Sequence, residues 1–377
     1  MKTYLDNAAT TKVDSEVVKA MKPYFEEKYG NASSLHSFGS EAKKALEESR
    51  KKIADKINAD PSEIIFVSSG TEADNLAITG IAKLKGKGHI ITSKIEHPAV
   101  LETCKELEKN GFDVTYLNVD KDGFVKDFEK SIKSNTILVS IMHANNEIGT
   151  VQDIEKIGKI CRSKNIIFHS DCVQSFTKEK IDVKKMSIDL ASFSSHKIHG
   201  PKGIAALYIK EGIKLKKLMF GGHHEKSIRP GTENIPGIVG FAKAVQIANE
   251  NDVERIKQMR DKLINGLLKI PDTRLNGDKE KRLCNNISIS FRYVEGESML
   301  LYLDEKGIAV STGSACSSQS LEPSHVLISI GLPHEIAHGT IRYSLSKYTT
   351  EKEIEYTIKT TKEVIERLRR ISPIKRR

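Results

Sequence analysis

The sequence predicts an α/β protein, in which a large domain with a mainly parallel, mixed sheet flanked by helices is joined to a smaller α+β domain. Helical and strand patterns alternate from about residue 40, which is typical of a parallel sheet covered by helices. The strands are apolar along their whole length, as strands buried on two faces are. The pattern changes after about residue 250. We therefore expect a large domain of residues 15–250 and a small domain of residues 1–14 and 251–377.

Each expected element follows from a local pattern. "EAKKALEESRKKIADKI" has the apolar spacing of an amphipathic helix, and "EIIFV" is a short apolar strand. The helix "TEADNLAITGIAKL" and the strand "HIITS" come next. Three more helices are expected, one from His97, one near residues 124–132 and one near residues 153–163. The strands that alternate with them or follow them are "DVTYLNV", "TILVSIM", "IIFHSD", "DLASFSS" and "IAALYIK". The small domain holds the helices "DVERIKQMRDKLINGLLKI" and "EKEIEYTIKTTKEVIERLRRI", with "NNISISF" and "GTIRYSL" between them.

Composition and charge exclude several classes of protein. With 38% hydrophobic and 29% charged residues the chain fits a soluble globular protein, and no apolar run approaches the roughly 18–20 residues of a membrane span. The N-terminus lacks the apolar core of a secretory signal, so we expect a cytoplasmic location. The net charge is +10, but lysines and arginines are mixed with acidic residues along most of the chain. Only the tail "RLRRISPIKRR" is a concentrated basic patch. A nucleic-acid partner is therefore not expected.

The five cysteines do not form a metal or disulfide pattern. Their number is odd, and neither a C-x-x-C pair nor a zinc-ligand spacing occurs, so we expect no metal. A cysteine with a chemical role should then be solitary and nucleophilic. Cys316 stands in "STGSACSSQS", among small and polar residues that are unlike the surroundings of a buried thiol.

Three motifs follow strands, where ligands of open α/β sheets bind. In "IIFVSSGTEADN" a helix opens at Thr71 and could bind a phosphate, although the same residues make an ordinary N-cap. In "HSDCVQSF", Asp171 could pair with a cationic ring nitrogen or cap a turn. In "SFSSHKIHGPKG", Lys197 is either an amine suited to Schiff-base chemistry or one more surface lysine. Together, these three motifs contain the parts that a pyridoxal phosphate site requires.

The motifs resemble those of a known family. "YLDNAATT", "GTEADN", "EHPAV", "HANNEIGTVQDI", "SDCVQS", "SFSSHKIHGPKG", "RPGTEN" and "STGSACSS" are similar to motifs of cysteine desulfurases of the NifS/IscS kind. These are class V aminotransferases within the fold-type I pyridoxal phosphate enzymes. The resemblance covers nearly the whole length, and several of its motifs are long and specific.

The resemblance implies pyridoxal 5'-phosphate as cofactor and L-cysteine as substrate. Lys197 would carry the cofactor as a Schiff base and remove the substrate Cα proton, and His97 would stack on the ring. Cys316 would attack the substrate sulfur, which yields a persulfide and L-alanine. Arg342 would bind the substrate carboxylate with help from Asn31. The implied cofactor-binding residues are Gly70, Thr71, Asn146, Asp171, Gln174, Ser194, His196, Lys197 and, from the other subunit, Thr232.

The resemblance also implies a homodimer and a sulfur-acceptor protein, such as an iron–sulfur scaffold. No residue of the cysteine loop is basic, so His97 and the substrate's own groups are the candidates for activating Cys316. The chain departs from the family pattern at Cys172, which we expect to be a packing residue, and at His223, His224 and Lys226. Two alternatives stay open: another pyridoxal phosphate enzyme on this scaffold (a selenocysteine lyase or an aminotransferase), and a non-catalytic sulfur carrier.

Overall fold

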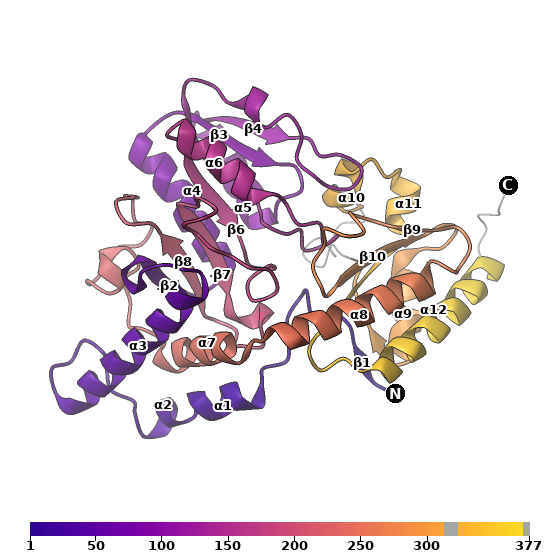
Figure 1. The fold of residues 1–377 in the computed structure, drawn as a ribbon, viewed down its shortest axis with the longest axis horizontal. Coiled ribbons are helices and arrows are strands. Elements are labelled where there is room, and N and C mark those ends of the chain that lie inside the picture. The colour runs from indigo at the N-terminus through magenta and orange to yellow at the C-terminus, as the bar shows by residue number, and fades with distance from the viewer. Residues whose placement is uncertain (313–322, 372–377) are drawn as a thin grey trace.

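The structure is a computed structural model that describes residues 1–312 and 323–371. Its largest feature is a seven-stranded sheet with the order β2-β8-β7-β6-β5-β3-β4, in which only β8 runs antiparallel to its neighbours. This sheet and its helices fill one side of the molecule in Figure 1. The strands are β2 (Ile64–Val67), β3 (His89–Ser93), β4 (Asp113–Leu117), β5 (Thr136–Ser140), β6 (Ile167–Asp171), β7 (Leu190–Ser194) and β8 (Ala205–Ile209). The mixed, mainly parallel sheet predicted from the sequence is confirmed.

Helices cover both faces of this sheet because alternate strand residues point to opposite sides. In β2, Ile64 and Phe66 join one apolar core, and Ile65 and Val67 join the other. The first core is completed by α3 (Ser37–Lys56), α6 (Ile154–Ser163) and α7 (Ile235–Ile247), and the second by α4 (Gly70–Lys85) and α5 (Pro98–Lys109). Two short helices, α1 (Ser15–Met21) and α2 (Pro23–Glu26), precede α3.

The rest of the chain forms a smaller unit with its own core. An antiparallel sheet of order β12-β10-β9 packs against long helices, while the N-terminal β1 pairs in parallel with β11. The core joins Leu5 to apolar residues between Ile256 and Leu368. The elements are β1 (Thr3–Tyr4), α8 (Glu250–Leu267), β9 (Thr273–Leu275), β10 (Asn286–Phe291), α9 (Gly296–Glu305), β11 (Ile308–Ala309), α10 (His325–Ser329), α11 (His334–His338), β12 (Thr340–Ser344) and α12 (Glu351–Ile371).

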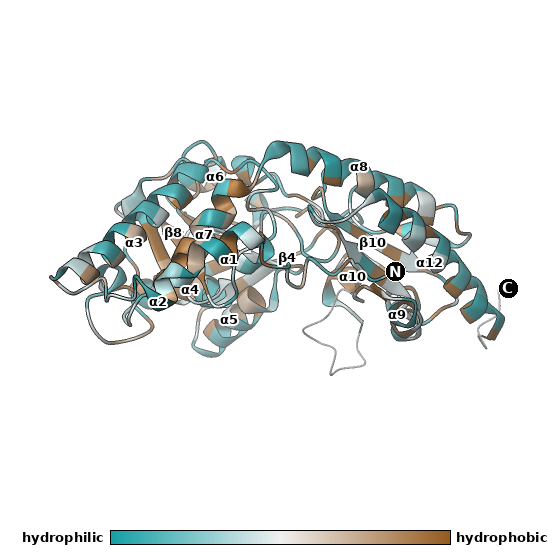
Figure 2. Cartoon of the chain, turned by 90° about the horizontal axis from the view of Figure 1, so that it is seen from below, coloured by the Kyte–Doolittle hydropathy of each residue, from teal (hydrophilic) through white to brown (hydrophobic). Residues whose placement is uncertain are grey.

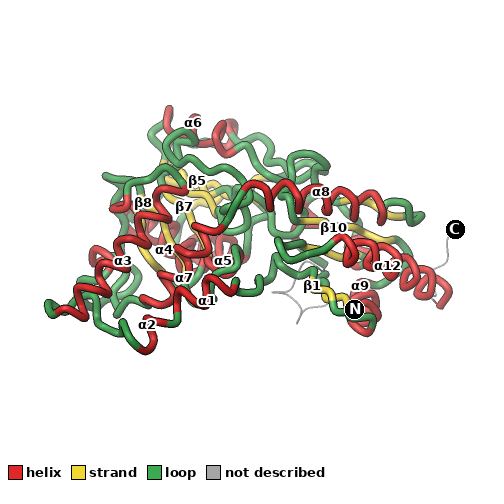
Figure 3. The backbone as a smooth tube through the Cα atoms, turned by 60° about the horizontal axis from the view of Figure 1, so that its bottom comes forward, coloured by secondary structure: helices red, strands yellow, loops and turns green. Residues whose placement is uncertain are grey.

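The two units lie side by side along the long axis of the molecule (Figure 3). The outer faces of α8 and α12 are mainly hydrophilic in Figure 2, in keeping with amphipathic helices that cover the smaller sheet. A fourth apolar cluster crosses between the units, because Val326, Leu327 and Ala337 of α10 and α11 pack on Ile95 and Met142 of the larger one. The division of the chain at residue 250 stays a prediction.

One expected helix is absent. Residues 124–132 contain a single 3₁₀ turn, Glu129–Ser131, instead of an α-helix. Val125 pairs with Val119 in an isolated bridge, and Asp127 has a φ of 52°, which interrupts a right-handed helix. Helices α1, α2, α7, α10 and α11 were not predicted. Within the described residues, no helix is both long and apolar enough to cross a membrane.

Candidate active site

The site forms where β6 and β7 end, at the carboxyl edge of the large sheet. Asp171 is the last residue of β6, and Lys197 ends the 3₁₀ turn Ser195–Lys197 that follows β7. Because β6 and β7 are parallel neighbours, both side chains emerge at the same edge. The Lys197 Nζ donates hydrogen bonds to the carbonyl oxygens of Ala8, at 2.6 Å, and Ala9, at 2.8 Å. The N-terminal segment therefore packs directly on the lysine.

Ala8 also connects Lys197 to the residues after β6. Its carbonyl accepts a second hydrogen bond, from Gln174 Nε2 at 3.0 Å. The turn between Asp171 and Gln174 is fixed by Asp171 Oδ1, which accepts from the Val173 N–H at 2.9 Å. One backbone carbonyl thus holds together two of the predicted cofactor residues. No sequence motif marked this role of Ala8, although it lies in the quoted "YLDNAATT".

Asp171, His97 and Lys197 are close enough to influence one another's protonation. Burial raises the pKa of Asp171, whereas the neighbouring His97 and Lys197 act to lower it. Burial lowers the pKa of His97, assisted by Lys197 and His325 and opposed by Asp171. The structure therefore gathers the three groups that the sequence analysis placed on separate motifs.

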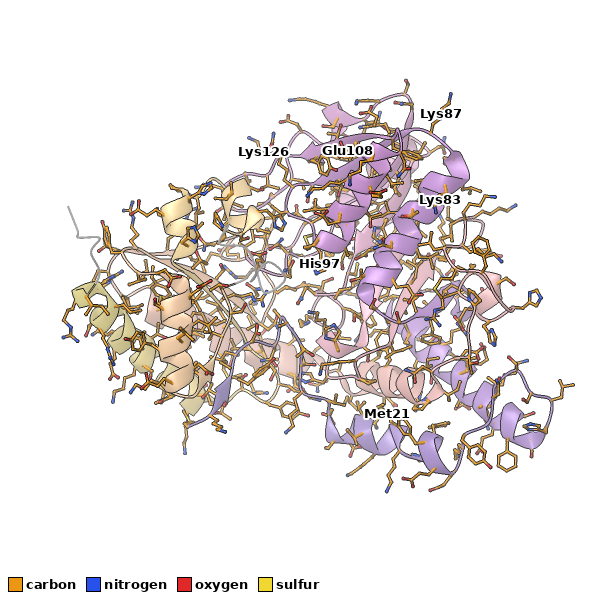
Figure 4. The ribbon with its side chains drawn as sticks, turned by 180° about the vertical axis from the view of Figure 1, so that it is seen from behind. Met21, Lys83, Lys87, His97, Glu108 and Lys126 are labelled. Atoms are coloured by element: carbon orange, nitrogen blue, oxygen red, sulfur yellow. The ribbon has the colours of Figure 1, made fainter. Side chains whose placement is uncertain are left out.

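His97 is held in place by the start of α5. It is the N-cap residue, and its Nδ1 accepts a hydrogen bond from the Ala99 N–H at 3.1 Å. Nδ1 therefore carries no proton in this arrangement, so the neutral ring carries its hydrogen on Nε2. Figure 4 shows His97 at the end of α5, on the side that faces the smaller unit.

The start of α4 lies beside the end of β7. A Cβ built on Gly70 would lie 3.0 Å from Val173 Cγ2 and 3.8 Å from Ser194 Cβ, so the start of α4 packs closely against the residues after β6 and at the end of β7. Ser69 caps the helix by accepting from the Glu72 N–H at 3.1 Å. The N–H groups of Gly70 and of Thr71, the next residue, precede the first intrahelical bond, and they point out of the helix end as donors for an anion.

His196 stands next to Lys197 and contacts the N-terminal segment. Its Nδ1 lies 3.1 Å from Thr10 Oγ1. Burial, together with the charge of Lys197, lowers the pKa of His196 to about 4. The ring is therefore neutral at neutral pH, and it can supply a hydrogen bond but no full positive charge.

Arg342 is buried in the middle of β12 and faces the N-terminal segment. Its Nη2 lies 3.0 Å from Asp6 Oδ1, and its Nη1 donates to the Asn146 carbonyl at 3.1 Å. Arg342 also exchanges two backbone hydrogen bonds with Ser311, of 2.6 and 3.2 Å. The predicted nucleophile, Cys316, lies five positions after Ser311 and outside the described residues.

Two predicted residues do not join this group. Asn31 lies exposed between α2 and α3, and its Oδ1 accepts from the nearby Ser33 N–H. Thr232 is exposed in a crevice that it lines with Ser68 and Arg229. Among the described residues no hydrogen bond connects either of them to Lys197 or Arg342.

The other four cysteines are buried free thiols. Cys172 packs in the apolar core between the large sheet and helices α3, α6 and α7, and burial raises its pKa to about 12. His223 Nδ1 contacts Ser227 Oγ and His224 Nδ1 accepts from the Gly231 N–H, so both histidines brace the loop before Thr232. In residues 1–312 and 323–371, no group of three His, Cys, Asp or Glu side chains is placed to hold a metal ion.

Comparison with known proteins places this geometry in a family. The model of the class-V aminotransferase family matches residues 3–357. Cysteine desulfurase IscS of Dictyoglomus turgidum is 52% identical over 99% of this chain and 96% of its own length. Cysteine desulfurase IscS of Methanosarcina thermophila is 52% identical over 98% of this chain and 94% of its own.

Solved structures agree. A NifS-like protein superposes with a TM-score of 0.91 at 40% identity, covering 97% of this chain and all of the other. A structure of SspA in complex with cysteine gives a TM-score of 0.84 at 39% identity, covering 93% of this chain and all of the other. The chain therefore belongs to the class-V aminotransferase family and, within it, to the NifS/IscS group of cysteine desulfurases.

Proposed function

We propose that this cysteine desulfurase binds pyridoxal 5'-phosphate and converts L-cysteine to L-alanine, with the sulfur captured as a persulfide on Cys316. The observation that carries the proposal is the meeting of Lys197, Asp171 and His97 at one sheet edge, around the Ala8 carbonyl. An amine, a carboxylate and an imidazole at one sheet edge are the protein groups that pyridoxal chemistry uses.

The residues present fit the cofactor. The N–H groups of Gly70 and Thr71 point out of the start of α4, and Ser194 lies beside Gly70, which suits a phosphate at a helix N-terminus. The buried Asp171 can pair with a protonated ring nitrogen, and such a pair relieves the cost of burying its charge. Gln174, Asn146 and His196 complete the proposed cofactor residues. When bound, pyridoxal phosphate supplies an electron sink for the electron pair released at the substrate Cα.

Lys197 is the proposed cofactor lysine and the base that removes the Cα proton. In the absence of cofactor, the carbonyls of Ala8 and Ala9 hold the Lys197 Nζ beside the ends of β6 and β7. A nitrogen bound to the cofactor carries at most one hydrogen, so at most one of these two bonds would remain. His97, with its hydrogen on Nε2, is oriented by its capping bond from Ala99 and holds that proton on the side of the ring away from the cap.

Arg342 is the proposed site for the substrate carboxylate. Its guanidinium is buried, and it can grip a carboxylate through two parallel N–H bonds. Asp6 supplies the counter-charge near the same guanidinium. We expect the substrate carboxylate to share Arg342 with Asp6, and Asn31 to assist it.

The sulfur transfer balances without an external oxidant. The Cβ–S bond of L-cysteine breaks as the sulfur bonds to Cys316 Sγ, and Cβ receives a proton to give the methyl group of L-alanine. The thiol proton of Cys316 leaves as the thiolate forms. The persulfide then passes its sulfur to an acceptor protein, such as an iron–sulfur scaffold. We propose a homodimer in which Thr232 reaches the partner's phosphate site.

One experiment tests the function. Purified protein with pyridoxal phosphate is given L-cysteine, and L-alanine is quantified alongside the cofactor's visible absorbance. We expect alanine from the wild type, none from Cys316→Ala, and loss of the visible band in Lys197→Ala. Turnover of selenocysteine but not cysteine would favour the lyase alternative, and amino-group transfer to a keto acid would favour the aminotransferase alternative. Sulfur binding without alanine would favour the carrier alternative.

A further inference from the structure

A second histidine lies next to His97, on an element of the other unit. His325 is the first residue of α10, and its Nε2 lies 3.0 Å from the carbonyl oxygen of Glu96. A carbonyl can only accept, so Nε2 of His325 carries the hydrogen and Nδ1 of its neutral ring is an acceptor. The hydrogen bond is made to the peptide that joins Glu96 to His97.

The position of His325 is fixed by its neighbours. Ser324 caps α10 and donates its hydroxyl to Glu147 Oε2, and both residues are buried. Val326 and Leu327 pack against Ile95 and other residues of the larger unit in a shared apolar cluster. A buried hydrogen bond to a carboxylate and an apolar contact therefore hold the two residues that flank His325.

The Glu96 side of the contact is equally fixed. The Glu96 carboxyl is fully buried, where it accepts from Ser93 Oγ at 2.6 Å and from the Met142 N–H at 3.0 Å. On the other side, the Ala99 N–H holds the His97 ring. The peptide bound by His325 thus joins two anchored side chains, and only small movements are open to it.

Three charged or titratable groups face His97: Asp171 at the end of β6, Lys197 after β7 and His325 on α10. Burial is the main cause that lowers the pKa of His97; Lys197 and His325 act in the same direction, and Asp171 opposes them. A proton added to His97 must also go to Nδ1, and this would break the bond from Ala99. Geometry and charge therefore act together to keep His97 neutral.

We propose that His325 is a positioning residue for His97: its hydrogen bond fixes the Glu96–His97 peptide against α10. This inference rests on the proposed function in taking His97 as part of the catalytic site. It assigns α10, which follows the Cys316 segment in the sequence, the task of holding a residue of the opposite unit in place.

The test uses the cofactor-free protein, so that it does not depend on turnover. The Cε1 resonance of His97, assigned by its loss in His97→Gln, is titrated by NMR in the wild type and three variants. His325→Gln keeps an N–H donor, His325→Phe removes it, and His334→Gln changes an exposed histidine of α11.

We expect the His97 midpoint to rise by about half a pH unit in His325→Phe, because the loosened ring loses part of the burial that lowers its pKa, and to stay unchanged in His325→Gln and His334→Gln. We also expect His325→Phe, but not His325→Gln, to shift the amide resonance of Ala99 and to lower kcat by ~10-fold with little change in KM. Unmoved His97 and Ala99 resonances in His325→Phe would overturn the proposal. If that variant fails to fold, His325→Asn, whose shorter side chain cannot place a donor at the position of Nε2, decides the matter. Absence of alanine formation with a shifted midpoint would instead count against the proposed function alone.

Discussion

The guanidinium of Arg342 and the carboxylate of Asp6 form an ion pair of 3.0 Å between β12 and the N-terminal segment. A buried arginine needs a counter-charge when no substrate is present, because an unpaired buried charge is costly. Asp6 fills this need and leaves Arg342 oriented for a second carboxylate. On the proposed function, the substrate would add a carboxylate to an arginine that is already in place.

Replacing Arg342 with lysine tests this role. Lysine keeps the charge but cannot form two parallel bonds to a carboxylate, so we expect Arg342→Lys to raise the KM for L-cysteine by ~10-fold or more. The kcat should change by less than about threefold, because the reacting atoms are not touched. Steady-state kinetics measures both. Arg274→Lys, at an exposed position of β9, is the control, and an equal rise in KM there would contradict the assignment.

The position of the persulfide is a second prediction. Burial raises the pKa of Cys284 to about 11 and that of Cys104, Cys161 and Cys172 to about 12, so these thiols are poor nucleophiles. After one turnover with L-cysteine, peptide mass spectrometry should find the extra sulfur on Cys316 alone. Cys172→Ala should turn over at the wild-type rate within about twofold and lose ~1 kcal/mol of stability. Sulfur on Cys284 or Cys172 would refute this assignment.

The buried carboxyl of Glu96 should make the stability of the folded protein depend on pH. Burial raises its pKa from 4.5 to about 8, so the folded protein binds this proton more tightly than the unfolded chain. The stabilising contribution of the neutral carboxyl is therefore complete below pH 4.5 and is lost as the pH rises to about 8.

The variant Glu96→Gln cannot ionise. We measure the Tm of both proteins by circular dichroism. We expect the Tm of the variant to increase relative to that of the wild type as the pH rises from 5 to 8, and the difference to stay constant above pH 8. Glu102→Gln, at an exposed position of α5, should follow the wild type. Parallel curves for Glu96→Gln and the wild type would show that Glu96 is ionised throughout.

A side chain at Gly70 should selectively weaken the binding of the cofactor's phosphate group. A Cβ at this position meets Val173 Cγ2 at 3.0 Å, so the start of α4, which carries the N–H groups proposed to bind the phosphate, must shift. We expect Gly70→Ala to weaken pyridoxal phosphate binding by ~10-fold, and to weaken the binding of pyridoxal, which has no phosphate, by less than about threefold. Fluorescence titration of the cofactor-free protein compares them. Thr79→Ala, nine residues further along α4, should change neither affinity, and an equal loss for both ligands would argue against the phosphate site.

The chemistry at the strand ends could be predicted from the sequence because it depends on local patterns. Asp171 ends one strand and Lys197 follows the next, and parallel strands bring such residues to one edge. Asp6 and Ala8 could not be found in this way. Their roles depend on where the N-terminal segment packs, and a backbone carbonyl such as that of Ala8 carries no side-chain signal.

Some elements of the fold could be predicted from local patterns in the same way, and others could not. Helix α7 is apolar around most of its circumference, so it lacks the amphipathic period that reveals α3 or α8. The helix expected at residues 124–132 fails because the bridge between Val125 and Val119 and the left-handed Asp127 outweigh its apolar spacing. His325 was passed over because nothing in its spacing relates it to Glu96, 229 positions earlier in the chain.

The paired hydrogen bonds between Ser311 and Arg342 have a consequence for the proposed site. They join the residue proposed to bind the substrate carboxylate to a separate backbone segment at Ser311, five positions before Cys316 in the sequence. A substitution that displaces β12 would therefore disturb Arg342 and Ser311 together, so the anchoring of the carboxylate site and of the backbone that leads to Cys316 depends on one strand.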